Sequence, residues 1–340
     1  MNKVIKSIHK LTPMQEGMLF HRMLDEKSFN YFLQNTFWVE GKIEMDKIRI
    51  ALSLVSYKHE ALSAAFVIPK SSGIPRQVFI ENREIECKYI ETDTLDTDIF
   101  IEKIKKEDME AGFDLQKDSL VRLQAVYFSK LNKFLLMFSN HHIIMDGWCI
   151  SLIFGDLMRY YSMLMEGMTY EDIKQLVTEE KRTSSKYGEY LTWLEKQDKE
   201  AALSYWTNLL KDYEFVAEIP VINEAKPVEE QVEYGSISLS QKETDKVKEI
   251  ARTCNVTINN ICESIWGIIL QQYNFTEDVV FGKVVSGRHV PISGIEETVG
   301  LFINTIPCRI QCSKDTTFRE LFLQTKKQGI SSNEYSYCSL

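Results

Sequence analysis

The chain has 340 residues, of which 44% are hydrophobic, and this is enough to form one or two sizeable cores. Its formal net charge is −9 and it has no basic cluster with interleaved aromatics, so a nucleic-acid partner is not expected. The seven cysteines are odd in number and irregularly spaced, which argues against a disulfide framework. No apolar run has membrane length and the start lacks the pattern of a signal peptide, so the sequence predicts a cytoplasmic protein with no membrane partner.

In the first half of the chain, helical and strand-like patterns alternate. Residues 45–59 have helical character, the alternation at 121–127 predicts a half-buried strand, and the polar residues 129–133 predict a hairpin turn. The apolar run 134–138 has strand length, and helical spacing follows between residues 152 and 167. The segment between this strand and this helix is therefore held by two rigid elements, and such positions often carry functional side chains.

The second half of the chain also mixes helices and strands. Residues 169–186 are polar and predict either a linker or a solvated helix. The elements that follow are helical segments near 190–194 and 203–210, a loop-like crossing at 223–230, a capped helix at 240–255, a helix at 257–273, a strand from 278, and a loop at 287–294 that leads into 299–310. This alternation predicts an α/β fold with an N-terminal lobe (residues 1–168), a linker (169–186) and a C-terminal lobe (187–340).

The most informative segment is NHHIIMDGW, residues 140–148, which lies between the predicted strand and helix. Histidine exchanges protons near neutral pH without a special environment. Neighbouring residues in an extended chain point to opposite sides, so His141 and His142 cannot both face one cavity if the chain stays extended. Asp146 is suited to orient a histidine or to pair with an arginine, and Gly147 is expected to let the backbone turn tightly.

Two other interpretations of this segment remain open on the residues alone. The histidines can be structural and Asp146 a helix cap, because short motifs are weak signals. The pair with Asp146 can also bind a metal, but Cys149 is a single thiol and no second ligand cluster accompanies it, so no metal is expected.

The HHxxxDGW pattern resembles the active-site motif of condensation domains of nonribosomal peptide synthetases, and other segments resemble the same family in the same order. These segments are LTPMQEGMLFH (residues 11–21), KHEAL with Phe66 (58–66), YGEY with Trp193 (187–193), VSGR (285–288), VGLFINT (299–305) and the remnant NEY (333–335). The resemblance spans nearly the whole chain.

The resemblance implies a V-shaped fold of two lobes, each similar to chloramphenicol acetyltransferase, with a tunnel between them. It implies an acyltransferase that joins a donor aminoacyl or peptidyl thioester to the amine of an acceptor aminoacyl thioester. Donor and acceptor peptidyl carrier proteins would dock at opposite mouths of the tunnel, and adenylation domains of the same assembly line would load them. The chain itself would bind no cofactor, because the phosphopantetheine arms belong to the carriers.

The resemblance also implies roles for individual residues. His142 would face the tunnel as the catalytic histidine, and the Gly147 N–H would help to hold the oxyanion. His141 and Trp148 would be structural, and Asp146 would pair with Arg288, or with Arg122 as the second choice. The residues expected at the tunnel or substrate are Met14, Gln15, Gly300, Phe302 and Asn304.

The chain departs from the family in two places. Lys58 and Ser63 stand where the family's RHExLR segment has arginines, and a tight arginine contact is not expected to survive as lysine or serine. The sequence stops soon after the NEY remnant, so the second lobe is expected to be incomplete and the chain to be a poor enzyme. An epimerization domain, which shares HHxxxDG, and a silent docking or scaffold fragment are the alternative functions.

Overall fold

The computed structural model describes residues 4–25, 28–219 and 235–338, and the crossing expected at 223–230 lies outside the described residues. The chain forms two compact units. The first comprises Met1–Gln197 and Ser286–Ile303, and the second comprises Asp198–Val285 and Asn304–Leu340. This division differs from the lobes expected at 168 and 187, because residues 286–303 pack with the N-terminal part of the chain although they come from the C-terminal part.

The first unit contains two β-sheets. One has the strand order β2-β7-β6-β5 and the other β1-β4-β3. The strands are β1 (Ile5–His9), β2 (Phe32–Glu40), β3 (Ala64–Val67), β4 (Arg76–Ile80), β5 (Glu86–Thr92), β6 (Val121–Phe128) and β7 (Lys133–His141). β5 and β6 pair in parallel, and the helix α3 (Thr97–Ala111) makes the crossover between them. The hairpin expected between residues 129 and 133 is confirmed by the antiparallel pairing of β6 with β7.

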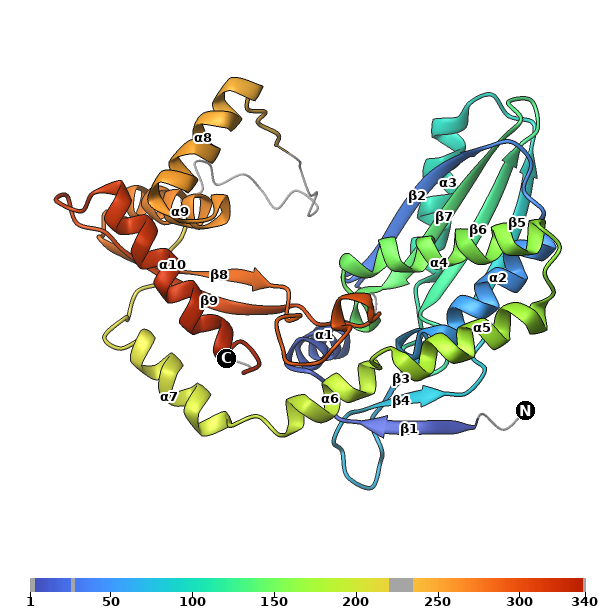
Figure 1. Cartoon of the computed structure of the whole chain (residues 1–340), viewed down its shortest axis with the longest axis horizontal. Helices are drawn as coiled ribbons and strands as arrows, with labels where there is room; N and C mark the ends of the chain where they lie inside the picture. The colour runs from blue at the N-terminus through green and yellow to red at the C-terminus, as the bar shows by residue number, and fades with distance from the viewer. Residues whose placement is uncertain (1–3, 26–27, 220–234, 339–340) are drawn as a thin grey trace. The chain divides into compact units, whose positions relative to one another are not determined.

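Helices cover both faces of the four-stranded sheet (Figure 1). The helices of this unit are α1 (Pro13–Leu24), α2 (Met45–Lys58), α3 (Thr97–Ala111), α4 (Trp148–Met165), α5 (Tyr170–Thr183) and α6 (Tyr187–Glu195), with short 3-10 turns η1 (Glu60–Ser63), η2 (His142–Ile144) and η3 (Ile295–Glu297). Phe134, Leu136 and Phe138 of β7 face the core that contains α2 and α4, whereas Leu135 and Met137 pack with α3. Burial on both faces explains why the run 134–138 is continuously apolar.

The expectation that residues 121–127 form a half-buried strand is wrong. All residues of β6 are buried except Tyr127, which is partly buried. Its polar residues Arg122 and Gln124 are accommodated because Asp108 of α3 accepts a hydrogen bond from Gln124 (3.0 Å) and forms an ion pair with Arg122 (3.0 Å). Asp108 also accepts hydrogen bonds from Ser139 (2.5 Å) and Gln34 (2.9 Å), so its buried charge is well compensated.

Residues 169–186, for which the sequence allows a linker or a solvated helix, are mostly helical and contain α5. Thr169 and Asp172 form a capping box at the start of α5, with the Asp172 side chain accepting from the Thr169 backbone at 3.1 Å. Ile173 and Val177 are fully buried in the core of the first unit. The segment therefore contains a helix that packs against the core of the first unit.

In the second unit, two strands pair with each other and pack against helices. The elements are α7 (Lys199–Leu209), α8 (Gln241–Cys254), α9 (Ile258–Asn274), β8 (Asp278–Val285), β9 (Asn304–Gln311) and α10 (Phe318–Glu334). The strands β8 and β9 are antiparallel. The predicted capping box of Ser240 and Glu243 is present, and α8 ends at Asn255 in the left-handed conformation.

Among the described residues, no helix combines the length and apolar character needed to cross a membrane. All seven cysteines are free thiols. Cys308 and Cys312, which lie four residues apart, are both expected from the sequence to be buried thiols, and this is right for Cys308 but not for Cys312, which is partly exposed.

Gly267 provides a test of the packing in the second unit. A Cβ added at Gly267 of α9 would lie 2.5–2.6 Å from atoms of Ile310 on β9. We therefore expect Gly267→Ala to lower the free energy of unfolding by about 1–3 kcal/mol, measured by urea denaturation. Gly329→Ala in α10 is the matched control, because its Cβ would meet only the flexible end of Lys283 at 3.4 Å. A Gly267→Ala loss that is simply additive with that of Ile310→Ala would contradict the steric explanation.

Candidate active site

The two histidines lie where β7 ends. Their backbone N–H groups are bonded to two other segments of the same chain, one on each side of β7. His141 is the last residue of β7 and its N–H donates to the Leu120 carbonyl at 3.0 Å. His142 begins η2 and its N–H donates to the Tyr31 carbonyl at 2.8 Å. These bonds fix the position of the motif at the end of the four-stranded sheet.

His141 is buried, as predicted, and it stabilises the turn that follows it. Only 5% of its surface is exposed, and its Nδ1 accepts a hydrogen bond from the Ile143 N–H at 3.2 Å. Burial, with smaller effects from Arg22 and His142, lowers the pKa of His141 to about 3. His141 is therefore neutral near pH 7, with its proton on Nε2.

His142 has a different environment. Its side chain is only partly buried, but its Nδ1 is buried and has no hydrogen-bond partner among the described residues. Because His141 is extended (φ −87°, ψ 129°), the side chains of its two neighbours, Asn140 and His142, point to the same side of the strand and away from that of His141. The buried Nδ1 leaves Nε2 as the ring nitrogen that is able to meet a substrate.

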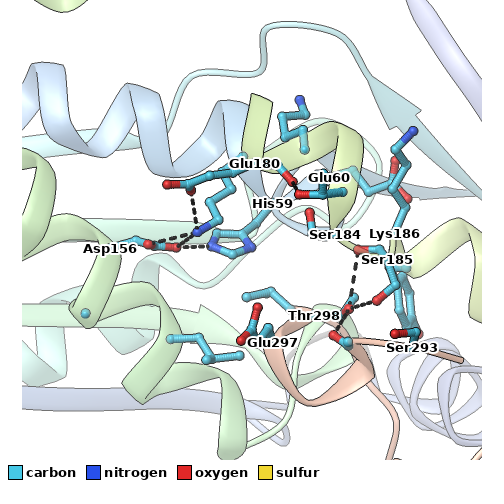
Figure 2. Close-up of a pocket in the computed structure, with 18 of the residues that line it drawn as sticks. His59, Glu60, Asp156, Glu180, Ser184, Ser185, Lys186, Ser293, Glu297 and Thr298 are labelled. Atoms are coloured by element: carbon cyan, nitrogen blue, oxygen red, sulfur yellow. Dashed lines mark hydrogen bonds and ion pairs between the residues drawn. The ribbon is translucent and has the colours of Figure 1, made fainter. Parts of the chain in front are cut away.

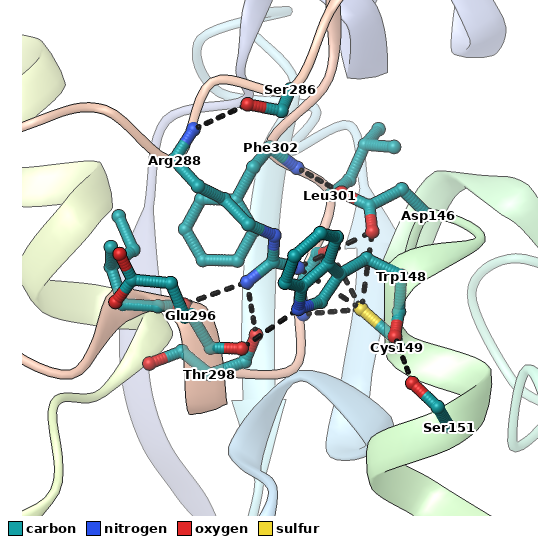
Figure 3. A network of polar contacts seen from close by, with 12 residues as sticks. Asp146, Trp148, Cys149, Ser151, Ser286, Arg288, Glu296, Thr298, Leu301 and Phe302 are labelled. Atoms are coloured by element: carbon teal, nitrogen blue, oxygen red, sulfur yellow. Dashed lines mark hydrogen bonds and ion pairs between the residues drawn. The ribbon is translucent and has the colours of Figure 1, made fainter. Parts of the chain in front are cut away.

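The predicted ion pair between Asp146 and Arg288 is confirmed. Arg288 Nη2 lies 3.3 Å from Asp146 Oδ1, and the two residues are 6% and 3% exposed (Figure 3). The other carboxylate oxygen of Asp146 accepts a hydrogen bond from the Phe302 N–H at 3.0 Å. Arg122, the second choice, pairs with Asp108 instead.

Arg288 also holds the residues that follow it in the chain. Its Nη1 donates to the Ile295 carbonyl at 2.7 Å and to the Thr298 carbonyl at 2.8 Å. Its guanidinium lies 4.1 Å from the centre of the Phe302 ring, within the range of a cation–π contact. The Arg288 side chain thus holds residues 286–303 at Ile295, Thr298 and Phe302.

Trp148 and Cys149, at the start of α4, add further bonds to the same residues. The half-exposed Trp148 indole donates to the Glu296 carbonyl at 2.8 Å. The Cys149 thiol donates to the Gly300 carbonyl at 3.3 Å. Burial and the nearby Asp146 raise the pKa of Cys149 to about 12, so it stays a thiol. The sequence suggested Cys149 only as a possible metal ligand. Asp146 lies just before α4, and the Cys149 N–H donates to its carbonyl at 3.1 Å, so the spacing of three residues is the signal that links them.

The backbone does turn at Gly147, where the Cys149 N–H donates to the Asp146 carbonyl at 3.1 Å, but this turn does not need the backbone freedom of glycine. Gly147 has φ −61° and ψ −24°, an ordinary helical conformation that any residue adopts. It is exposed, and a Cβ there would have no atom within 4 Å. The absence of a side chain therefore leaves open space beside the N-terminus of α4.

The remaining predicted residues have varied surroundings. Gln15 is fully buried, and its Nε2 donates to the Ile143 carbonyl at 3.0 Å, so it supports η2 from the interior. Met14 is partly buried against the core. Gly300 lies so close to the ring of Tyr187, the first residue of the YGEY segment, that an added Cβ would collide with it. Position 300 therefore has no room for a side chain. Asn304 belongs to the second unit, where it donates to the Ser336 carbonyl at 2.7 Å.

A separate cavity of about 580 Å³ lies in the first unit and is lined by residues of α4, α5 and two loops (Figure 2). Its wall includes the KHEAL segment. His59 Nε2 lies 2.8 Å from Asp156, and Lys58 contacts Asp156 at 2.9 Å and Glu180 at 3.1 Å. Burial lowers the pKa of His59 against the opposing effect of Asp156. Lysine at position 58 therefore still makes two ion pairs, while Ser63 bonds the Glu60 carbonyl at 2.6 Å.

Within residues 4–25, 28–219 and 235–338, no group of three or more histidine, cysteine or carboxylate side chains is arranged to hold a metal ion.

Comparison with known proteins identifies the family. A family model described as "Condensation domain" matches residues 5–340. The chain belongs to the condensation-domain family. This domain is 38% identical over 340 residues to bacitracin synthase 1 of Bacillus licheniformis, which covers 99% of this chain and 6% of that protein. It is 36% identical over 343 residues to gramicidin S synthase 2 of Brevibacillus brevis, which covers 99% of this chain and 7% of that protein. The condensation domain therefore spans only a small part of the length of these curated relatives.

Solved structures confirm the predicted α/β fold of the family. The condensation domain from the monacolin K polyketide synthase is similar with a TM-score of 0.76, at 16% identity, over 98% of this chain and 74% of that one. At this level of identity the similarity concerns the fold alone.

The buried ion pair should make a large contribution to stability. We expect Asp146→Asn to lower the free energy of unfolding by about 3–5 kcal/mol, because Arg288 would keep its charge in a buried site. Urea denaturation measures this loss, and Asp46→Asn, which removes the exposed contact with Arg49, should change stability little. The double variant with Arg288→Met should lose less than the sum of the two single variants. Equal losses for Asp146→Asn and Asp46→Asn would show that the buried pair is not important.

His141 predicts a specific pH dependence. Its pKa is about 3 in the folded chain and ordinarily 6.5, so between these values the unfolded chain binds a proton that the folded chain does not. Stability should therefore fall as the pH is lowered from 6.5 towards 3, by at most about 1.4 kcal/mol per pH unit for this group. His141→Asn should make this dependence less steep. An unchanged slope in His141→Asn would disprove this assignment.

Proposed function

We propose that this chain catalyses amide-bond formation between two thioesters held on carrier proteins. The observation that carries the proposal is the placement of His142, which is partly buried at the end of β7, five residues before the open N-terminus of α4 at Gly147. Membership of the condensation-domain family over residues 5–340 supports the same reaction. Related segments occur in synthases named for the peptides bacitracin and gramicidin S.

The proposed reaction has two steps. The α-amine of the acceptor attacks the carbonyl carbon of the donor thioester and forms a tetrahedral intermediate. The C–S bond then breaks and releases a thiolate. The thiolate takes up the proton lost by the amine and leaves as a thiol on the donor carrier. His142 either orients the amine or takes its proton through Nε2, a role for which a neutral imidazole is suited at neutral pH.

Gly147 is proposed to stabilise the oxyanion of the intermediate. Its N–H has no acceptor among the described residues, and it precedes α4, an 18-residue helix. The N-terminus of a helix favours negative charge, and a preorganised donor at an oxyanion contributes several kcal/mol, on the order of 3–4. The open space beside Gly147 gives a substrate carbonyl room to approach.

The partners follow from the reaction. We expect donor and acceptor peptidyl carrier proteins, with phosphopantetheine arms that present the thioesters, and adenylation domains that load them in the cytoplasm. The two-lobed organisation with boundaries at 168 and 187, and substrate contacts from Met14, Gly300, Phe302 and Asn304, remain proposals of the same kind.

The function can be tested with the chain and two carriers loaded with different amino acids. We expect a dipeptide on the acceptor carrier, detected by mass spectrometry, and a loss of at least about a hundredfold in rate for His142→Ala. His289→Ala is a control at an exposed histidine, and urea denaturation checks that His142→Ala remains folded.

Each other outcome of this assay contradicts the proposal. A D-residue on one carrier would point to epimerization, and the absence of any product would point to a docking or scaffold role. Near-normal rates in His142→Ala would remove His142 from the mechanism.

A further inference from the structure

His142 and two other polar side chains, Asn140 and Ser119, contain buried atoms that have no hydrogen-bond partner among the described residues. They are Nδ1 of His142, both polar atoms of the Asn140 amide, and Oγ of Ser119. Asn140 has no exposed surface. Buried polar groups in proteins are nearly always hydrogen-bonded, directly or through ordered water, so a cluster of such atoms needs an explanation.

The strand register brings these groups to one corner of the sheet. Asn140 of β7 pairs with Val121 of β6, and the His141 N–H donates to the Leu120 carbonyl at 3.0 Å, which extends the pairing by one residue. Counting one residue further, just beyond the ends of β6 and β7, the same register sets Ser119 against His142. Directly opposed residues lie on the same face of a sheet, and so do residues two apart in a strand. Asn140, His142 and Ser119 therefore belong to the same face.

The chemistry of the cluster matches that of an ordered water site. Buried waters typically make about three hydrogen bonds to groups that have no other partner. One water bound by these groups would accept from Nδ1–H of His142 and donate to Oδ1 of Asn140 and to Oγ of Ser119. No covalent step is involved, and every group keeps its own proton.

We propose that Asn140, assisted by Ser119, is a positioning residue that keeps the proton of neutral His142 on Nδ1 through one bridging water. The tautomer of a histidine is set by the hydrogen bond that its second nitrogen makes. With the proton on Nδ1, Nε2 carries the lone pair that the acceptor amine meets. The consequence for catalysis rests on the proposed function of His142, but the tautomer itself does not.

The tautomer can be measured without any activity. Two-bond 1H–15N correlation spectra distinguish Nδ1–H from Nε2–H imidazoles, and the chain has only six histidines, so His142→Gln assigns the signal. We expect the Nδ1–H form in the unaltered chain and a shift towards Nε2–H in Asn140→Leu, with a smaller shift in Ser119→Ala. Ser139→Ala is the control, because Ser139 is equally buried but bonds Asp108 on the opposite face.

The kinetic expectation is a fall in kcat of about tenfold to a hundredfold in Asn140→Leu with little change in KM, since outer partners of functional histidines have effects of this size. If Asn140→Leu does not fold, Asn140→Ser keeps a polar atom and provides the same comparison with a smaller shift. An Nε2–H tautomer in the unaltered chain, or a tautomer unchanged by these substitutions, would overturn the proposal. A correct tautomer without dipeptide formation would instead contradict the proposed function alone.

Discussion

The arrangement of the site depends on the buried ion pair between Asp146 and Arg288 (Figure 3). A buried charge is costly unless it is paired and hydrogen-bonded, and here both partners have additional bonds. Asp146 accepts from the Phe302 N–H, and Arg288 donates to two carbonyls of the same segment. Because separation would leave two charges in the interior, residues 286–303 are held on the start of α4, next to Gly147.

The second requirement is a rigid strand under the histidines. β7 is the penultimate strand of its sheet, with partners on both sides and helices on both faces. Its last residues can therefore shift only if the packing of α2, α3 and α4 changes as well. Asp108 contributes to this rigidity because it ties side chains from three strands to α3. The neutral, buried His141 also stabilises η2, because its Nδ1 accepts a hydrogen bond from the Ile143 N–H. His142 is more exposed than His141.

Several elements could be predicted from local patterns because local physics decides them. The helix at residues 45–59, the capping box of Ser240 and the hairpin between β6 and β7 follow from periodicity, capping and turn chemistry. The alternation in β6 misled the prediction, since Arg122 and Gln124 read as solvent-facing but are compensated by Asp108 on a helix far along the chain. The expected turn at Gly147 is present, but its dihedral angles are available to any residue, and what distinguishes the position is the open space beside it.

By itself, the sequence determined the α/β class and the family motif with its two histidines, since these rest on residue chemistry and short-range spacing. The pairing of Asp146 with an arginine came from the resemblance to the family. Tertiary structure decided between the two candidate arginines in favour of Arg288, and it alone showed that residues 286–303 pack with the N-terminal part of the chain. Strand register also set Asn140 opposite Val121, two residues after Ser119 in the chain. These outcomes depend on contacts between segments separated by more than a hundred residues, or on which face of a sheet is covered, and local propensities carry no information about either.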